Sequence, residues 1–303
     1  MLTSLRRLLE LVRFSHTLFA LPFALLAAVM AWTAPTPNGS TIAFEPRHLL
    51  GLLICLVGAR SAAMAFNRLV DRHLDAANPR TQSRHLPAGL LRVTTVVWFT
   101  VLSGLIFVAG TLLFWPNPLP VALSLPVLAF LCGYSYAKRF TSLAHFWLGT
   151  ALLLAPVSAW IALRGAVLLE QPSDLLPAVL LGGAVLAWVA GFDIIYACQD
   201  YSYDVAARLR SVPARLGVPR ALRLAAVCHA LMLALLAALP LACPQIAFGW
   251  IYGLALLAVA GLLAYEHRLV RPDDLTRVNI AFFHVNAIVS IGLFVAGTVD
   301  LLW

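Results

Sequence analysis

Long, almost uninterrupted apolar segments alternate along this chain with short polar stretches. Each segment is close to the length of about 20 residues that an α-helix needs to cross the hydrocarbon of a bilayer. Turn-rich breaks such as residues 34–39 and 115–118 separate the segments. Nine such segments can be distinguished, at about residues 16–34, 48–66, 93–114, 118–136, 144–163, 175–196, 222–240, 246–264 and 279–302. The pattern therefore predicts an all-α integral membrane protein with nine transmembrane helices.

The composition supports this prediction. About 62% of the 303 residues are hydrophobic and only 11% are charged, whereas a soluble domain carries roughly 25% charged residues. So few charges cannot cover a water-facing surface, which excludes a soluble globular protein. Nine helices of about 20 residues leave roughly 120 residues for loops and termini. We therefore expect a single transmembrane domain over residues 1–303, with no separate soluble domain.

The positive charges gather on one side of the predicted bundle. Of the 21 Lys and Arg residues, 18 fall in the N-terminal stretch and in four loops, at 67–92, 137–143, 205–223 and 265–278. Because positively charged loops tend to stay on the cytoplasmic side, we expect the N-terminus and these loops to be cytoplasmic, in the inner (plasma) membrane. Orientation and contact with anionic membrane lipids account for the net charge of +8. Nucleic acid is therefore not indicated as a partner.

Acidic residues are scarce, and two groups of them lie at the predicted cytoplasmic ends of the second and sixth helices. The first group, with an accompanying asparagine, is Asn67, Asp71 and Asp75. The second, with a tyrosine, is Asp193, Tyr196, Asp200 and Asp204. Steps of three and four residues place each group on one face of a continued helix. Both groups lie on the same side of the membrane, so they can face each other across one cavity.

Such clusters are typical of a site for a hard cation. Like charges four residues apart repel, and carboxylates close to hydrocarbon are costly unless they line a cavity or bind a partner. Mg²⁺ prefers oxygen ligands and typically binds through carboxylates together with substrate phosphates. Two clusters that each hold an ion would form a clamp for a diphosphate. The alternative is that these acids are interfacial and pair with neighbouring arginines.

Basic residues accompany both acidic groups. Guanidinium groups suit phosphate oxygens, although membrane orientation alone would place several of these residues here. The candidates for contact with a diphosphate are Arg72, Arg80, Lys138, Arg139 and Arg210.

Arg60 lies inside the second predicted helix, seven residues before Asn67. It is therefore on the same helical face, roughly 10 Å deeper in the membrane. An arginine at this depth is a functional candidate. It could bind the carboxylate of an acidic acceptor or pair with a structural carbonyl.

Over nearly its whole length, the sequence resembles the UbiA-type intramembrane aromatic prenyltransferases. Asn67-x3-Asp71-x3-Asp75 and the residues 78–87 that follow resemble the first motif of that family. Asp193-x2-Tyr196-Ala197-x-Gln199-Asp200-x3-Asp204 resembles the second motif. Tyr134-x3-Lys138-Arg139 resembles a further family segment, and Arg60 falls where the family has an intramembrane arginine.

The resemblance implies a fold and a reaction. The fold is a bundle of nine transmembrane helices around a central cavity. The reaction is the Mg²⁺-dependent transfer of a polyprenyl group from a polyprenyl diphosphate to a ring carbon of a small aromatic acid. The implied roles are catalysis by Asp71, Asp75, Asp200 and Asp204, metal binding by these four with Asn67 and Asp193, and acceptor binding by Arg60, Tyr134 and Tyr196.

Within that family the chain is most similar to the 4-hydroxybenzoate polyprenyltransferase branch. The start at residues 14–23 and the Tyr196-Ala197-x-Gln199-Asp200 form of the second motif carry this likeness. The expected acceptor is 4-hydroxybenzoate, in ubiquinone- or menaquinone-type quinone synthesis, and the alternative is a hydroxylated naphthoate. A membrane transporter is a more distant alternative. One local departure is Arg208, where relatives commonly have glycine.

Overall fold

The computed structural model describes residues 2–12 and 19–303, and nearly all of them are helical. The only β pairing in this part of the chain is an isolated bridge between Arg271 and Asp274. The described residues divide into two compact units. Residues 2–12 and 45–137 form unit 1, and residues 19–44 and 138–303 form unit 2.

Unit 1 is organised around one long helix. Its helices are α1 (Leu2–Leu11), α3 (Pro46–Val70), α4 (Arg72–Ala77), α5 (Val93–Thr111), η2 (Leu112–Phe114), α6 (Leu119–Gly133) and η3 (Tyr134–Tyr136). α3 packs along α5. A Cβ atom at Gly58 would lie 2.9 Å from the backbone nitrogen of Phe107, so the absence of a side chain lets these two backbones approach closely. Close packing of this kind replaces the hydrophobic effect, which does not hold helices together inside lipid.

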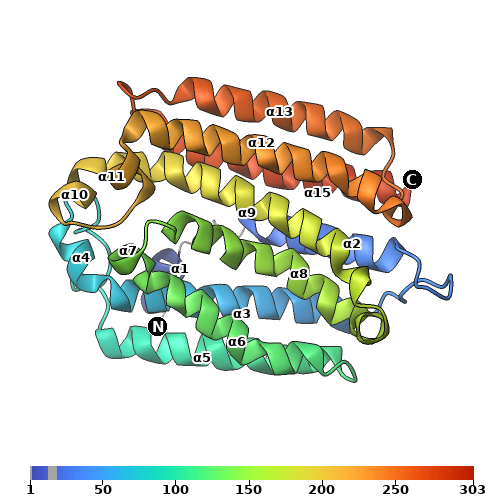
Figure 1. Ribbon diagram of the computed structural model, residues 1–303. Helices are drawn as coiled ribbons and strands as arrows, with labels where there is room; N and C mark the ends of the chain where they lie inside the picture. The colour runs from blue at the N-terminus through green and yellow to red at the C-terminus, as the bar shows by residue number, and fades with distance from the viewer. Residues whose placement is uncertain (1, 13–18) are drawn as a thin grey trace. The chain divides into compact units, whose positions relative to one another are not determined.

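Unit 2 is built around α9 (Leu176–Ala197), most of whose residues are buried. Its other helices are α2 (Leu21–Thr33), α7 (Ala137–Phe140), α8 (Ala144–Glu170), η4 (Pro172–Leu175), η5 (Cys198–Asp200), α10 (Tyr201–Ala206), α11 (Val212–Leu216), α12 (Val218–Ala242), η6 (Pro244–Ile246), α13 (Trp250–Leu269), α14 (Val278–Ile280), the π-helical η7 (Ala281–Val285) and α15 (Asn286–Leu302). α9 packs between α8 and α12 (Figure 1). α8 and α9 approach closely at Gly149, which has no side chain. A Cβ atom there would lie 2.5 Å from the carbonyl oxygen of Leu186, too close to fit.

The predicted fold class is confirmed. Within the described chain, eight segments are long and apolar enough to cross a membrane. They are Pro46–Val70, Val93–Phe114, Leu119–Phe140, Ala144–Glu170, Pro172–Ala206, Val218–Ala242, Trp250–Leu269 and Phe282–Leu302. The helix in the ninth position, α2, has 13 residues. The predicted first span, 16–34, starts outside the described residues, and so does the stretch 14–23 that carries the likeness to one branch of the family.

One end of unit 2 is held by a fully buried arginine. Arg164, at a kink in α8, has a side chain that is 0% exposed. Its Nε and Nη2 donate to the two carboxylate oxygens of Asp174 (2.8 and 2.7 Å). Nη1 and Nη2 also donate to the carbonyl oxygens of Ala31, Ala34 and Pro35, at 2.8–3.1 Å. This arginine therefore joins the C-terminal end of α2 to α8 and η4.

Polar side chains also connect four helices deep in unit 2, in what we term the interhelical polar chain. Asn286 donates to Glu266 Oε1 (3.1 Å) and accepts from the indole nitrogen of Trp188 (2.6 Å). His229 and His267 share a hydrogen bond of 3.0 Å, and Glu266 Oε2 lies 3.9 Å from His229 Nδ1. α9, α12, α13 and α15 are thereby linked. Polar links inside a membrane bundle hold helices together, because the alternative is an unsatisfied group in hydrocarbon.

Candidate active site

The first acidic group lies where α3 ends and α4 begins. Asn67 is in the last turn of α3, Asp71 lies between the two helices with φ −91° and ψ 4°, and Asp75 is in α4. The helix is therefore interrupted at Asp71 rather than continuous as expected. The backbone N–H groups of Asp71 and Asp75 still donate to the carbonyl oxygens four residues earlier, at 2.9 and 2.8 Å. The helical spacing of the group is thus kept across the junction.

Neighbouring arginines pair with this group. Arg84 donates to Asp75 Oδ1 at 2.6 Å, and the buried Arg68 donates to Asn67 Oδ1 at 3.2 Å. Asn67 Nδ2 in turn donates to Asp71 Oδ2 at 2.9 Å. Asp75 is only 6% exposed, and its Oδ2 accepts no hydrogen bond. Arg68 Nη1 lies 4.0 Å from this oxygen.

The second acidic group also crosses a helix junction. Asp193 and Tyr196 lie in α9, Asp200 closes the 3₁₀ turn η5, and Asp204 lies in α10. The 3₁₀ turn is tighter than an α-helix, so the group does not share one unbroken helical face as expected. Asp200 and Asp204 are buried, at 7% and 2% exposure. Oδ2 of Asp204 accepts no hydrogen bond.

Each of these two carboxylate oxygens, Asp75 Oδ2 and Asp204 Oδ2, suits the binding of a cation. Burying an oxygen of a charged carboxylate without a hydrogen bond is costly, and a metal ion bound at either aspartate would supply the missing partner there. In the described residues no group of three or more His, Cys, Asp or Glu side chains could hold a metal by itself. Mg²⁺ does not need such a group, since it commonly keeps waters and shares substrate phosphates as ligands. The donor set therefore fits Mg²⁺ better than a metal with a closed protein cage. The first acidic group belongs to unit 1 and the second to unit 2.

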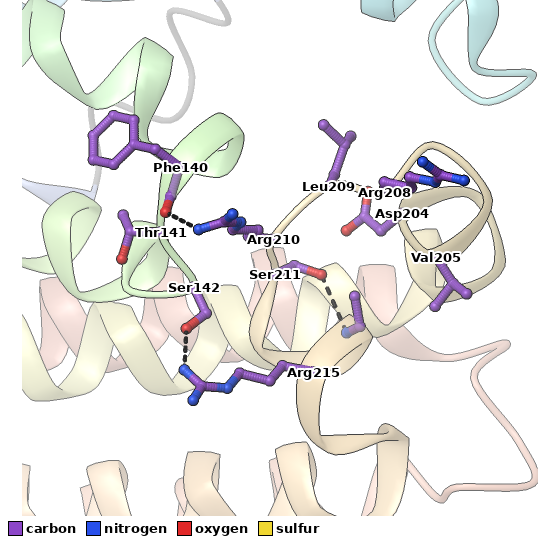
Figure 2. Close-up of a pocket in the computed structure, with 11 residues that line it drawn as sticks. Phe140, Thr141, Ser142, Asp204, Val205, Arg208, Leu209, Arg210, Ser211 and Arg215 are labelled. Atoms are coloured by element: carbon purple, nitrogen blue, oxygen red, sulfur yellow. Dashed lines mark hydrogen bonds between the residues drawn. The ribbon is translucent and has the colours of Figure 1, made fainter.

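A basic cavity of about 560 Å³ lies beside the second acidic group, within unit 2. Asp204, Arg208, Arg210 and Arg215 line it, and Figure 2 shows Arg210 and Arg215 reaching toward the segment at residues 140–142. Arg210 Nη1 donates to the carbonyl oxygen of Phe140 (2.6 Å), and Arg215 Nη1 donates to the Ser142 hydroxyl (3.1 Å). The structure thus brings two of the predicted residues, Asp204 and Arg210, to one cavity. Arg208 and Arg215, which follow the second acidic group in the sequence, line the same cavity.

The other predicted basic residues are dispersed. In unit 2, Lys138 is half-buried, and its carbonyl oxygen accepts from the Arg210 backbone N–H (2.9 Å), while Arg139 is exposed. In unit 1, Arg72 and Arg80 are exposed, and Arg72 Nη1 donates to the carbonyl oxygen of Leu69. Their membership in a diphosphate site stays a prediction.

The three predicted acceptor residues are also divided between the units. Arg60, within α3, and Tyr134, the first residue of η3, belong to unit 1, and both are half-buried. Tyr196 belongs to unit 2, where its ring lies 4.3 Å from the ring of Phe282 in the π-helix. Phe282 also contacts Phe192, so Tyr196 sits at the edge of a cluster of aromatic rings.

One residue that the sequence did not reveal is His145, at the start of α8. Its side chain is 0% exposed. Nδ1 lies 2.6 Å from Asp193 Oδ2, and Nε2 accepts from the backbone N–H of Val212 at 3.3 Å. In the sequence, His145 is a single histidine at the start of an apolar segment. A buried histidine with a purely structural role would look the same.

The backbone at Arg208 has a conformation that favours glycine. Its φ of 53° is left-handed, a conformation that glycine adopts without cost and that other residues adopt under strain. We expect Arg208→Gly to raise the free energy of unfolding by up to about 1 kcal/mol, measured by thermal unfolding of the purified protein. Arg208→Ala removes the same charge but keeps Cβ, and should give no gain. Equal stabilisation by both substitutions would mean that charge, and not the backbone, is the cause.

Comparison with protein families places the chain clearly. The model of the UbiA prenyltransferase family matches residues 13–288. The 4-hydroxybenzoate octaprenyltransferase of Chromohalobacter salexigens is 33% identical over 237 residues, which cover 77% of this chain and 75% of that protein. The enzyme of the same name from Aromatoleum aromaticum is 30% identical over 262 residues, covering 85% and 83%.

Solved structures share the fold. The apo structure of a UbiA homolog from Aeropyrum pernix K1 superposes with a TM-score of 0.80 at 30% identity, covering 94% of this chain and 98% of that one. A UbiA homolog from Archaeoglobus fulgidus, bound to GPP and Mg²⁺, superposes with a TM-score of 0.69 at 19% identity, covering 98% and 100%. The second likeness is one of fold alone.

Proposed function

The chain belongs to the UbiA prenyltransferase family, and from this membership we propose that it transfers a polyprenyl group from a polyprenyl diphosphate to 4-hydroxybenzoate. The new bond forms at the ring carbon ortho to the hydroxyl group, as a step in the synthesis of a ubiquinone- or menaquinone-type quinone. Relatives at 30–33% identity that carry the name 4-hydroxybenzoate octaprenyltransferase support this acceptor. The Archaeoglobus homolog bound to GPP and Mg²⁺ supports the donor class and the metal.

One observation carries the proposal. Each acidic group contains a buried carboxylate with one oxygen that accepts no hydrogen bond, namely Asp75 Oδ2 and Asp204 Oδ2. We assign these two aspartates, with Asn67, Asp71 and Asp200, to the binding of Mg²⁺ and diphosphate. Bound Mg²⁺ would stabilise the negative charge of the leaving diphosphate.

The chain's own residues supply the rest of the chemistry. Arg72, Arg80, Lys138, Arg139 and Arg210 are proposed to hold the diphosphate oxygens. Their charges lower the cost of breaking the allylic C–O bond, since charge that develops on the leaving group is stabilised in advance. The ring carbon attacks the allylic carbon, and an aspartate or the released diphosphate takes the ring proton.

The acceptor is proposed to lie deeper than the diphosphate. Arg60 would bind the acceptor carboxylate, with Tyr134 and Tyr196 beside the ring. The apolar spans exclude water, which would otherwise capture the allylic cation. The charge distribution of the loops supports a site that opens on the cytoplasmic side of the inner membrane.

A transfer assay tests the function and the acceptor together. We expect membranes that contain the protein to form a hydrophobic product from labelled polyprenyl diphosphate, Mg²⁺ and 4-hydroxybenzoate. EDTA should abolish the product, and excess Mg²⁺ should restore it, because the diphosphate must be neutralised before it can leave. A product formed only with a hydroxylated naphthoate would replace the acceptor. Undiminished product in EDTA would contradict the metal-dependent mechanism.

A further inference from the structure

His145 connects three segments of unit 2. Its imidazole lies at the start of α8 and is completely buried. Nδ1 is 2.6 Å from Asp193 Oδ2 in α9, and Nε2 is 3.3 Å from the backbone nitrogen of Val212, the first residue of α11. Both ring nitrogens are therefore used.

The partners of this ring fix where its proton is. A backbone N–H can only donate, so Nε2 must accept from Val212 and carries no hydrogen in this contact. Nδ1 then carries the hydrogen and donates it to Asp193 Oδ2. The arrangement needs a neutral histidine and uses one oxygen of the Asp193 carboxylate.

Asp193 differs in this respect from Asp75 and Asp204, two aspartates of the proposed metal site. Asp75 and Asp204 each keep a buried oxygen that accepts no hydrogen bond, whereas Asp193 Oδ2 makes a short hydrogen bond. Asp193 also lies within α9, before the 3₁₀ turn, whereas Asp200 and Asp204 lie beyond the end of α9.

The contacts of His145 lie at the two ends of the segment that carries Asp200 and Asp204. This segment, residues 198–211, leaves α9 one turn after Asp193 and ends immediately before Val212. It contains a 3₁₀ turn, a helix of 6 residues and a loop. Arg210 also ties this segment to Lys138 and Phe140, and the contacts of His145 hold the chain on either side of it.

We propose that Asp193 is a positioning residue and not a metal ligand. With His145 it fixes both ends of segment 198–211 and so places Asp200 and Asp204 toward the metal and the diphosphate. The last step rests on the proposed function, whereas the fixing of the segment does not. Partners that orient ligands in this way commonly change metal affinity by 10–100-fold when they are removed.

Hydrogen exchange on the full-length protein without substrate tests whether His145 holds segment 198–211 in place. His145→Ala should raise amide exchange across residues 198–212 at least about tenfold, because Val212 loses its acceptor and α8 loses its side-chain link to Asp193 and Val212. Asp193→Asn should leave this exchange unchanged, since the amide oxygen can still accept from His145 Nδ1. His145→Gln, which can both donate and accept, should restore part of the protection. Exchange that stays at the wild-type level in His145→Ala would overturn the proposal.

Metal binding tests whether Asp193 is a ligand or a positioning residue. The probes are Mn²⁺ and inorganic diphosphate, and the readout is electron paramagnetic resonance. Asp193→Asn should bind Mn²⁺ within about twofold of the wild type. His145→Ala should bind about tenfold more weakly, and Asp204→Asn should lose binding. If Asp193→Asn loses binding as completely as Asp204→Asn, Asp193 is a ligand and the proposal fails. A wild-type protein that binds Mn²⁺ and diphosphate but transfers no prenyl group would instead contradict the proposed function alone.

Discussion

Replacing Asp200 or Asp71 by alanine is expected to reduce prenyl transfer at least about a thousandfold. Each substitution removes a carboxylate from one of the two acidic groups, and with it the proposed stabilisation of the leaving diphosphate. Loss of one metal interaction of this kind is worth several kcal/mol, and about 4 kcal/mol corresponds to three powers of ten in rate. The measurement is turnover of labelled polyprenyl diphosphate with 4-hydroxybenzoate at saturating Mg²⁺.

A matched control separates this effect from a general loss of charge. Asp273 is an exposed acid in the loop before α14, outside both acidic groups. Asp273→Ala should keep wild-type turnover, and all three variants should purify with the same yield and thermal midpoint. Near-normal turnover in Asp71→Ala or Asp200→Ala would mean that the two acidic groups do not act on one diphosphate.

Removing the buried arginine of α8 is expected to have the largest effect on stability. Arg164→Met deletes five hydrogen bonds, and among the described residues it leaves the indole N–H of Trp160 as the remaining side-chain partner of the Asp174 carboxylate. Breaking a buried ion pair in this way costs roughly 3–5 kcal/mol. At roughly 2–4 °C per kcal/mol for chains of 150–250 residues, the thermal midpoint should fall by about 10 °C. Scanning fluorimetry in detergent measures the change.

Two further variants show whether the burial of the ion pair is the cause. Arg47 pairs with Glu45 at 2.5 Å, but both side chains are more than 40% exposed. Exposed pairs are worth at most about 1 kcal/mol, so Arg47→Met should shift the midpoint far less. Adding Asp174→Leu to Arg164→Met should recover part of the loss, because the unpaired charge is gone. A midpoint for Arg164→Met equal to that of Arg47→Met would rule out this account.

The membrane helices could be predicted because their signal is local. Length and continuous apolarity decide whether a segment crosses hydrocarbon, so the long helices appear in the predicted order. The ends were less certain: α3 continues to Val70 and α8 to Glu170, beyond the predicted limits of 66 and 163. These last turns are partly polar, and polarity alone does not end a helix.

The geometry of the acidic groups could be predicted only in part. Spacing by four residues identified Asp71 and Asp200, but it assumed an unbroken helix. The structure has a junction at Asp71 and a 3₁₀ turn before Asp200. Both depend on how the ends of α3 and α9 pack, which no local pattern records.

Contacts between distant residues could not be predicted at all. Nothing in the sequence marked Arg164 as a link between helices, yet three of its acceptors lie about 130 residues earlier in the chain. His145 was indistinguishable from any buried histidine until α9 and α11 were placed beside it. These partners meet only because of the fold topology, which cannot be predicted from the local patterns of a single sequence.

The interhelical polar chain has a consequence for biosynthesis. Glu266 in α13 is made before Asn286, its hydrogen-bond donor in α15. During insertion α13 would therefore enter lipid with a bare carboxyl group, which hydrocarbon does not tolerate well. We expect the insertion machinery to retain α13 until α15 has been synthesised, so that the two helices leave it as a pair.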